Sequence, residues 1–402
     1  MINRAFVKLA LFCALSVCMI TARRLEPVVY DIEQTEFAQQ LQHAIKMRDD
    51  LSATTNKQQP PQASTTPCSS PSSRWLKSII ADVSEEDLTT FFDNHLHVLP
   101  FVYKLHVAPR QYDQEYFGLD GEYTQEITSV HNQAQEFWSD SGVRDEIYLL
   151  SAHGSDLADR HDKLVPTLEL LFRNTYDSDY TVYDHAADIQ ELITRLPGGY
   201  NFPLLTFNAF ATDEMDDEED DSSIIIGDGY FQFQQALGMD SEGPEYAHAH
   251  EFSHHLQFLL GVSDTQSGIA QVAKKSELLA DAFSAYFLAH DQGGNMVSDE
   301  ISNVHSVAFS LGDCVKSSAG HHGTPIQRRC ATVWGAELAD DREDMDKIDL
   351  FEFQNRFDTW YETVDDLSDS CQHLHSAAAS RSSRILSLQV MTLLIGGLSV
   401  LL

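Results

Sequence analysis

The chain has few basic residues. Lysine and arginine number 26 against 62 aspartates and glutamates, which gives a formal net charge of −36 over 402 residues. Nucleic acids and anionic membrane surfaces bind proteins largely through lysine and arginine, so we expect neither as a partner. The hydrophobic fraction of 43% and the charged fraction of 22% are those of an ordinary globular protein, which excludes disorder along the whole chain.

Glycosylation sequons are absent and cysteines are scarce. No Asn-x-Ser/Thr sequence occurs, so we expect no N-linked glycan. Of six cysteines, Cys13 and Cys18 lie in an N-terminal apolar segment. The other four suggest two disulfides in an oxidising compartment, with three possible connectivities. We favour the more local pairing, which is Cys314 with Cys330 and Cys68 with Cys371.

Apolar segments at the two ends of the chain are typical of targeting signals. Residues 9–20 are apolar, follow two basic residues and are too short to span a bilayer, so we assign 1–22 as a secretory signal peptide. Residues 385–402 carry no charge and follow small and polar segments, a pattern typical of a GPI-anchor signal. A transmembrane tail is the alternative, although no basic residues follow it. We therefore expect a secreted protein or one attached to the outer face of the plasma membrane.

One long domain is expected between these ends. Residues 52–73 contain four prolines and many serines and threonines but no acidic residue, which is typical of a flexible linker. We therefore divide the remaining chain into an N-terminal segment with linker (23–73), one domain (74–370) and a C-terminal spacer with the anchor signal or tail (371–402).

Local patterns predict both helices and strands in this domain. Helices are expected over 164–173 and 186–195, and strands over 203–207 and 223–226. The acidic run at 213–221 lies between the two strands, and its like charges predict a solvated loop.

A His-Glu-x-x-His motif carries the main chemical signal. It lies in a helix expected over 245–260. His250 and His254 are four residues apart, so they share a helix face and can bind one Zn²⁺ ion. Glu251 lies beside them, where it can take a proton from an activated water as the catalytic base.

A second helix, expected from about 266 to 290, supplies carboxylates. Catalytic zinc requires a third protein ligand, and we assign this role to Glu277. Asp281 shares its face and is expected to orient His250 through the ring nitrogen that does not bind metal. The alternative is that both acids form a solvated face balanced by Lys274 and Lys275.

The order of these motifs resembles gluzincins, the thermolysin-like clan, and more narrowly the neutral zinc metallopeptidase family. The matching segments are 226–229, 249–258, 277–281, 311–313 and 321–328. The resemblance covers roughly residues 204–335, about a third of the chain. The resemblance implies an α+β, zincin-like fold, with the motif helix packed on a twisted mixed sheet and followed by a mostly helical lobe. Metzincins match less well, because Gln257 and Leu260 replace their glycine and third histidine.

This resemblance implies a zinc metallopeptidase, by default an endopeptidase, that cleaves peptide or protein substrates. We expect His322 to stabilise the oxyanion as a further catalytic residue. The strand at 224–226, if it is a sheet edge, would pair with an extended substrate. The acidic run favours basic peptides if it borders the cleft. The alternative function is a surface binding or adhesion protein that keeps the metal site without turnover.

Overall fold

A computed structural model of the chain describes residues 70–371, apart from 110–113, 144–146, 174, 213–221, 263–269, 314–320, 341–346 and 368–370. The expected signal peptide, most of the expected linker, the acidic run, and the expected anchor signal or tail therefore lie outside the described residues, as do Cys68 and Cys314. No described helix combines the length and the apolar character needed to cross a bilayer.

The first described part of the chain is helical. Its helices are α3 (Pro71–Ile79), α4 (Glu85–Asp93), α5 (Leu99–His106) and α6 (Thr124–Trp138). Ser70 and Ser84 cap α3 and α4 by accepting a hydrogen bond from a backbone N–H in the first turn. Because α3 begins at Pro71 and buries Leu76, the expected domain boundary at residue 74 falls inside a packed helix.

A three-stranded mixed sheet follows. Strand β3 (Ser223–Gly227) lies between β1 (Tyr148–Ala152), to which it is parallel, and β2 (Ala209–Thr212), to which it is antiparallel. Every residue of β3 is buried, as its continuous apolar sequence requires of a central strand. The expected strand at 223–226 is therefore present. It is the central strand, so the condition under which it would pair with a substrate as a sheet edge is not met. Among the described strands, β2 holds the edge beside it.

The expected strand at 203–207 is a 3₁₀ turn (η6, Pro203–Leu205). The reason is close backbone packing. A Cβ on Gly227 would lie 2.0 Å from the carbonyl oxygen of Thr206, and one on Gly229 would lie 2.0 Å from that of Pro203. The turn therefore packs directly against the end of β3, and the chain becomes extended only at Ala209.

Short helices between the strands and after β3 complete the sheet-containing part of the molecule. They are η3 (Gly154–Ala158), the π-helical turn η4 (Arg160–Leu164), α7 (Val165–Phe172), α8 (Val182–Arg195), η5 (Gly199–Asn201) and α9 (Asp228–Ala236). Helix α7 matches the expected helix at 164–173. Helix α8 begins four residues earlier than expected, because Thr181 and Asp184 form a reciprocal capping box.

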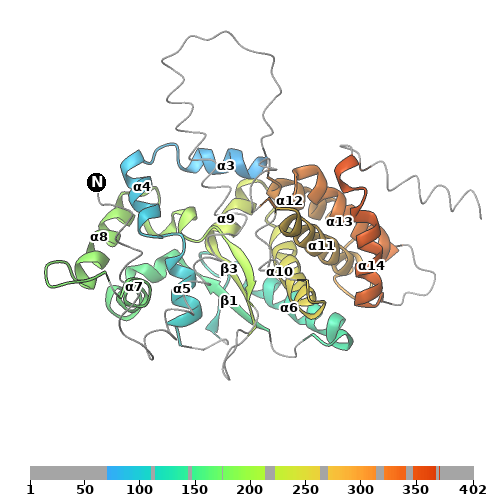
Figure 1. The fold of residues 1–402 in the computed structure, drawn as a ribbon, viewed down its shortest axis with the longest axis horizontal. Coiled ribbons are helices and arrows are strands. Elements are labelled where there is room, and N and C mark those ends of the chain that lie inside the picture. Colours follow the sequence, from blue (N-terminus) through green and yellow to red (C-terminus); the bar gives the residue numbers. More distant parts are fainter. Residues whose placement is uncertain are drawn as a thin grey trace, which may run out of the picture.

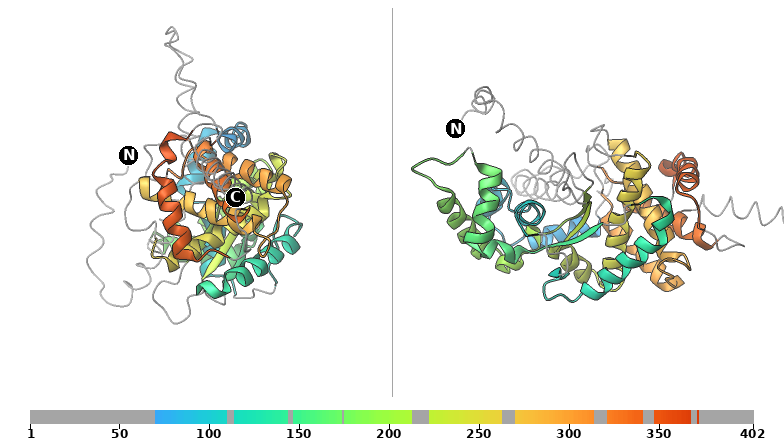
Figure 2. Two further views of the ribbon diagram at one scale, coloured as in Figure 1. Left: turned by 90° about the vertical axis from the view of Figure 1, so that its right-hand side faces the viewer. Right: turned by 90° about the horizontal axis from the view of Figure 1, so that it is seen from below.

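The second half of the chain forms a helical lobe. It comprises α10 (Gly243–Leu259), α11 (Ala270–Ala289), α12 (Ser298–Leu311), α13 (Pro325–Asp340) and α14 (Leu350–Tyr361). Helix α11 packs against both α10 and α13 (Figure 1). Seen from below, α7 and α8 lie at one end of the molecule and this lobe at the other, with the sheet between them (Figure 2). The expected α+β class with a mixed sheet is confirmed.

One disulfide joins Cys330 on α13 to Cys371, with the two Cα atoms 5.5 Å apart. The expected pairs of Cys314 with Cys330 and of Cys68 with Cys371 are therefore wrong. Proximity in sequence was the wrong criterion, because α14 brings the chain back against α13 and places two buried cysteines together across 41 residues.

Candidate metal centre

The motif helix α10 is buried along most of its length. It packs against α6, α11, β2 and β3, and its residues from Tyr246 to Ser253 are all buried. Pro244 occupies its first turn, and Gly261, with φ of +67°, follows its end. The expected helix is confirmed to within two residues. Because α10 is buried, its polar side chains need partners inside the protein.

Three expected metal ligands converge. Potential ligand atoms of His250, His254 and Glu277 all lie within 4.8 Å of one another. His250 Nε2 is 3.2 Å from Glu277 Oε2, and His254 Nε2 is 3.6 Å from Glu277 Oε1. Two imidazole nitrogens and one carboxylate facing a common point can hold a metal ion, and this donor set is one that catalytic zinc uses.

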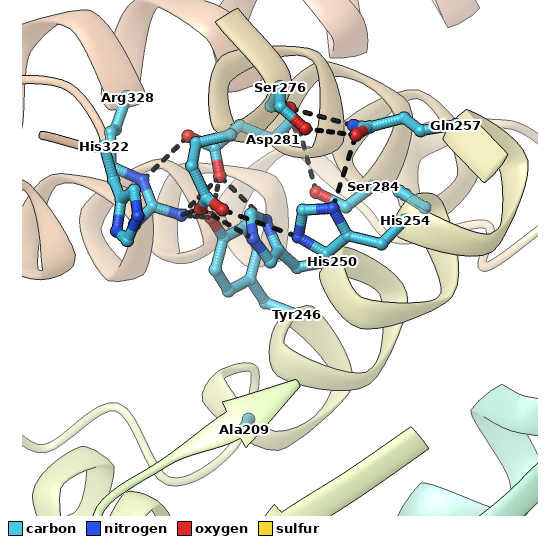
Figure 3. Close-up of polar contacts among 12 residues, drawn as sticks. Ala209, Tyr246, His250, His254, Gln257, Ser276, Asp281, Ser284, His322 and Arg328 are labelled. Carbon is cyan, nitrogen blue, oxygen red and sulfur yellow. Dashed lines mark hydrogen bonds and ion pairs between the residues drawn. The ribbon is translucent and has the colours of Figure 1, made fainter. Parts of the chain in front are cut away.

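The orientation of His254 is set by a short chain of hydrogen bonds (Figure 3). Its Nδ1 lies 3.3 Å from Gln257 Oε1. The Gln257 amide donates to the backbone oxygen of Ser276 at 2.8 Å, and the Ser276 hydroxyl donates to Gln257 Oε1. Because Oε1 can only accept, it selects the tautomer of His254 with hydrogen on Nδ1, which directs the lone pair of Nε2 toward Glu277.

Asp281 lies beside the expected ring nitrogen of His250. Its Oδ1 is 3.0 Å from His250 Nδ1, at an angle outside that of a regular hydrogen bond. The Tyr246 hydroxyl also donates to Asp281. Arg328 donates to both carboxylate oxygens of Asp281, at 2.9 Å from Nε and 2.8 Å from Nη2 (Figure 3). Asp281 is therefore held from three sides in a fully buried position.

The buried charges of this centre balance one another. Burial alone raises the pKa of Asp281, but Arg328 and His250 outweigh it and hold the pKa below its usual value. For Glu277, burial is outweighed by His322, His250 and His254, so its pKa is also lowered. Arg328 Nη2 lies 3.7 Å from Glu277 Oε2. Both carboxylates are therefore anionic at neutral pH, which suits a cation-binding site.

The two lysines beside these acids have other partners. Lys274 lies 2.8 Å from Asp365, and Lys275 lies 2.8 Å from Asp358. Glu277 is 8% exposed and Asp281 is 0% exposed. The alternative of a solvated acidic face balanced by these lysines is therefore contradicted.

Glu251 lies buried beside the ligands. Burial and, to a smaller extent, the negative charge of Glu277 raise its pKa to about 7. The backbone N–H of Ala211, on strand β2, donates a hydrogen bond to Glu251. A carboxyl group with a pKa near neutrality can both accept and return a proton at physiological pH.

His322 lies at the margin of the centre. Its backbone N–H donates to Asp313 Oδ2 at 2.9 Å, and His321 Nδ1 is 2.7 Å from Asp313 Oδ1. These contacts hold the segment before α13 in place. Figure 3 shows the His322 imidazole beside Arg328. Burial lowers the pKa of His322, so its imidazole is neutral at neutral pH.

Sequence reasoning did not identify the supporting residues Arg328, Tyr246, Gln257 and Ser276. One signal was available for Arg328. Two carboxylates predicted to be buried on one helix face need a cation besides the metal, and Arg328 lies in the first turn of the helix that follows His322. The other three are ordinary polar residues whose partners become evident only when α10 and α11 are packed together.

Comparisons of the chain with protein-family models, curated proteins and solved structures found no match. Function is therefore inferred from the geometry of this centre, and the resemblance to gluzincins rests on motif order alone.

Proposed function

We propose that this protein is a zinc-dependent metallopeptidase of the gluzincin type with a zincin-like fold. One observation carries the proposal. His250, His254 and Glu277 converge from two helices in a buried position, and Glu251 lies next to them with a pKa raised to about 7. A site built only to hold a metal has no need of such a carboxylate.

The donor set favours zinc over calcium and magnesium, and the glutamate within the His-Glu-x-x-His helix favours zinc over iron(II), which shares this donor set. Calcium and magnesium prefer oxygen ligands, whereas two imidazoles with one carboxylate are typical of a catalytic zinc site with an open position. Bound zinc would supply Lewis acidity toward a carbonyl group and acidify a water molecule.

Side chains of the protein have the remaining catalytic roles. Glu251 accepts the proton of the attacking water and returns it to the departing amine. His322, neutral and close to Arg328, provides an N–H donor for the oxygen that becomes negative during the reaction. Asp281, Tyr246 and Gln257 hold the two ligand imidazoles in place, so that little reorganisation accompanies the reaction.

Strand β2 is the natural docking element for a peptide substrate. It is the described edge strand on this side of the sheet, and its Ala211 contacts Glu251 through the backbone. An extended peptide that pairs with β2 would run past Glu251, which places a peptide bond next to the catalytic carboxylate. The role first assigned to residues 224–226 therefore passes to β2.

The proposal is tested with a peptide mixture of diverse sequence. Purified wild-type protein should cleave it, and a chelator should abolish cleavage. Glu251→Gln should retain the metal but lose at least about 100-fold in activity, because proton transfer is lost. Glu352→Gln, on an exposed surface of α14, is the matched control and should remain fully active. If wild-type protein cleaves no peptide in a chelator-sensitive way, the non-catalytic binding or adhesion function is favoured instead.

A further inference from the structure

A second group of chemically competent side chains lies outside the metal centre. Ser151 Oγ is 2.8 Å from His153 Nε2, and His153 Nδ1 is 2.9 Å and 3.0 Å from the two carboxylate oxygens of Asp228. All three residues are buried. A hydroxyl bonded to one imidazole nitrogen, with a carboxylate on the other, has the geometry of a nucleophile, a base and an orienting acid.

The sheet topology explains this juxtaposition. Strands β1 and β3 are parallel, and Ala152 pairs with Gly227 at their carboxyl ends. His153 and Asp228 are the next residues of the two strands, so they emerge side by side. The metal centre lies farther along, since Glu251 contacts Ala211, which pairs with Ile224. Asp228 follows Ile224 by four positions along extended chain, a distance of about 13 Å. The two groups are distinct.

Glu115 occupies the position that a reacting oxygen would take. Its Oε2 accepts hydrogen bonds from both the backbone N–H and the hydroxyl of Ser151, each at 3.0 Å. Its Oε1 is 2.5 Å from Lys104 Nζ. A negatively charged oxygen about 3 Å from a nucleophile and from a backbone N–H donor is the arrangement of an oxyanion site. Here the anion belongs to the protein itself.

Tyr116 covers the same group. Its ring stacks on the imidazole of His153 with the ring centroids 4.0 Å apart, and it is itself 40% exposed. The partly exposed ring of Tyr116 therefore covers one face of the buried imidazole of His153. Glu115 and Tyr116 are consecutive, so one local displacement would expose both the base and the anion-binding position.

We propose that Ser151, His153 and Asp228 form a second catalytic centre, with Ser151 as a nucleophile toward carboxylic esters and with Glu115 as an internal inhibitor. While Glu115 is in place, its carboxylate can only accept, so the Ser151 hydroxyl donates its hydrogen bond to Glu115 and Oγ accepts one from the Nε2–H of His153. With a proton on Nε2, His153 cannot act as the base, which prevents attack. When Glu115 is displaced, the Nε2 proton is released to solvent and the hydroxyl can donate to the free Nε2.

The reaction then follows in balanced steps. Ser151 Oγ forms a bond to the acyl carbon, its proton passes to His153 Nε2, and the alcohol departs with that proton. Water then attacks the acyl group, a proton returns through His153 to Ser151 Oγ, and the carboxylic acid leaves. The backbone N–H of Ser151 and the ammonium of Lys104 face the oxygen that becomes negative.

The test uses the full chain and a fluorophosphonate probe, which forms an Oγ–P bond with an activated serine and releases fluoride. Peptide mapping locates the adduct. We expect slow labelling of wild type at Ser151, labelling at least about 10-fold faster in Glu115→Ala and in Tyr116→Ala, and none in Ser151→Ala or His153→Ala. Chelator and Glu251→Gln should not change labelling, which separates this centre from the metal centre.

Each variant is compared with wild type by thermal melting, so that loss of labelling is scored only in folded protein. The two unblocking variants remove different contacts, and a folding defect in one leaves the other informative. If a folded Glu115→Ala or Tyr116→Ala protein is not labelled at Ser151 above the Ser151→Ala background, the group is a buried structural network and the proposal is overturned.

Discussion

At the scale of single residues, Arg328 supplies positive charge that balances the buried carboxylates of the metal centre. It is 1% exposed, donates to both oxygens of Asp281 and lies 3.7 Å from Glu277. Removal of one partner from a buried ion pair costs far more than loss of an exposed pair, because the remaining charge stays desolvated.

We therefore predict that Arg328→Met lowers the free energy of unfolding by about 3–5 kcal/mol. Arg195→Met is the matched control. Arg195 pairs with Asp87 through an ion pair in which the arginine side chain is 47% exposed, and its loss should have little measurable effect. Urea denaturation of both variants in the presence of a chelator checks this. Equal stability of the two variants would contradict the role given to Arg328.

Substitution of a metal ligand and substitution of the residue that supports a ligand should have different effects on metal affinity. Glu277→Ala removes a ligand, so the protein should lose its metal during dialysis. Asp281→Asn keeps the shape of the side chain but weakens the support of His250, and it should retain metal with about 10- to 100-fold lower affinity. Elemental analysis and titration against a competing chelator measure both effects. Wild-type metal content in Glu277→Ala would remove Glu277 from the site.

The ligand residues were predictable because their signal is local. His250, Glu251 and His254 follow from helical spacing, and Glu277 and Asp281 follow from the same spacing on the next helix. Arg328 and Gln257 were not assigned a role, because each acts across a helix contact that no local pattern reveals. The Ser151, His153 and Asp228 group was missed for the same reason, since only the parallel pairing of β1 with β3 joins it.

At the scale of elements, one acidic side chain on α6 and one on α10 make the stability of the folded protein depend on pH. Burial raises the pKa of Glu126 and of Glu245 to about 7, and the negative charge of Glu245 also acts on Glu126. The ordinary value for both is 4.5. Between these values the two acids bind more protons in the folded protein than in the unfolded chain, so this pair contributes a negative slope to the pH dependence of the free energy of unfolding between pH 4.5 and 7.

We predict that Glu126→Gln reduces this slope, because the glutamine is neutral in both states. Glu136→Gln, on an exposed position of the same helix, should keep the wild-type slope. Denaturation curves at several pH values between 4.5 and 7.5 measure the slope for the three proteins. A Glu126→Gln variant that shows the full wild-type slope would contradict the assignment of this acid.

Helices were more predictable than strands. The apolar periodicity and terminal residues of α7, α10 and α11 indicate these helices correctly. The segment 203–207 has a strand-like composition, but its backbone packs against Gly227 and Gly229 and forms a turn. The edge strand β2 escaped notice because it has four residues, three of them only partly buried, and so lacks a continuous apolar run.

At the scale of the whole molecule, the disulfide between Cys330 and Cys371 ties the end of the described chain to α13. The bridge closes a loop of 41 residues, which in the chain-entropy model stabilises the folded state by about 4 kcal/mol. Sequence proximity favoured a different partner for Cys330, and the choice depended on how α14 turns back against α13.

We predict that a non-reducing peptide map contains a peptide pair linking Cys330 to Cys371. Cys371→Ser should lower the free energy of unfolding by about 4 kcal/mol. Ser306→Ala, on the exposed side of α12, is a control that should leave stability unchanged. Recovery of a Cys314–Cys330 peptide pair in the map would contradict the structure.

The fold class was predictable at this scale, whereas the arrangement of the sheet was not. A mixed helix and strand pattern indicates an α+β protein. The strand order β1-β3-β2 depends on pairings between residues up to 75 apart, such as Tyr148 with Ser223, and no local pattern specifies them. Because β3 lies at the centre of the sheet, we propose that an extended substrate pairs with β2 rather than with β3.

The most direct test of the central claim is anomalous X-ray diffraction at the zinc absorption edge from crystals of the zinc-loaded protein. We predict one peak about 2.0–2.2 Å from Nε2 of His250, Nε2 of His254 and a carboxylate oxygen of Glu277. No peak at saturating zinc, or a peak whose ligands exclude these three side chains, would contradict the account.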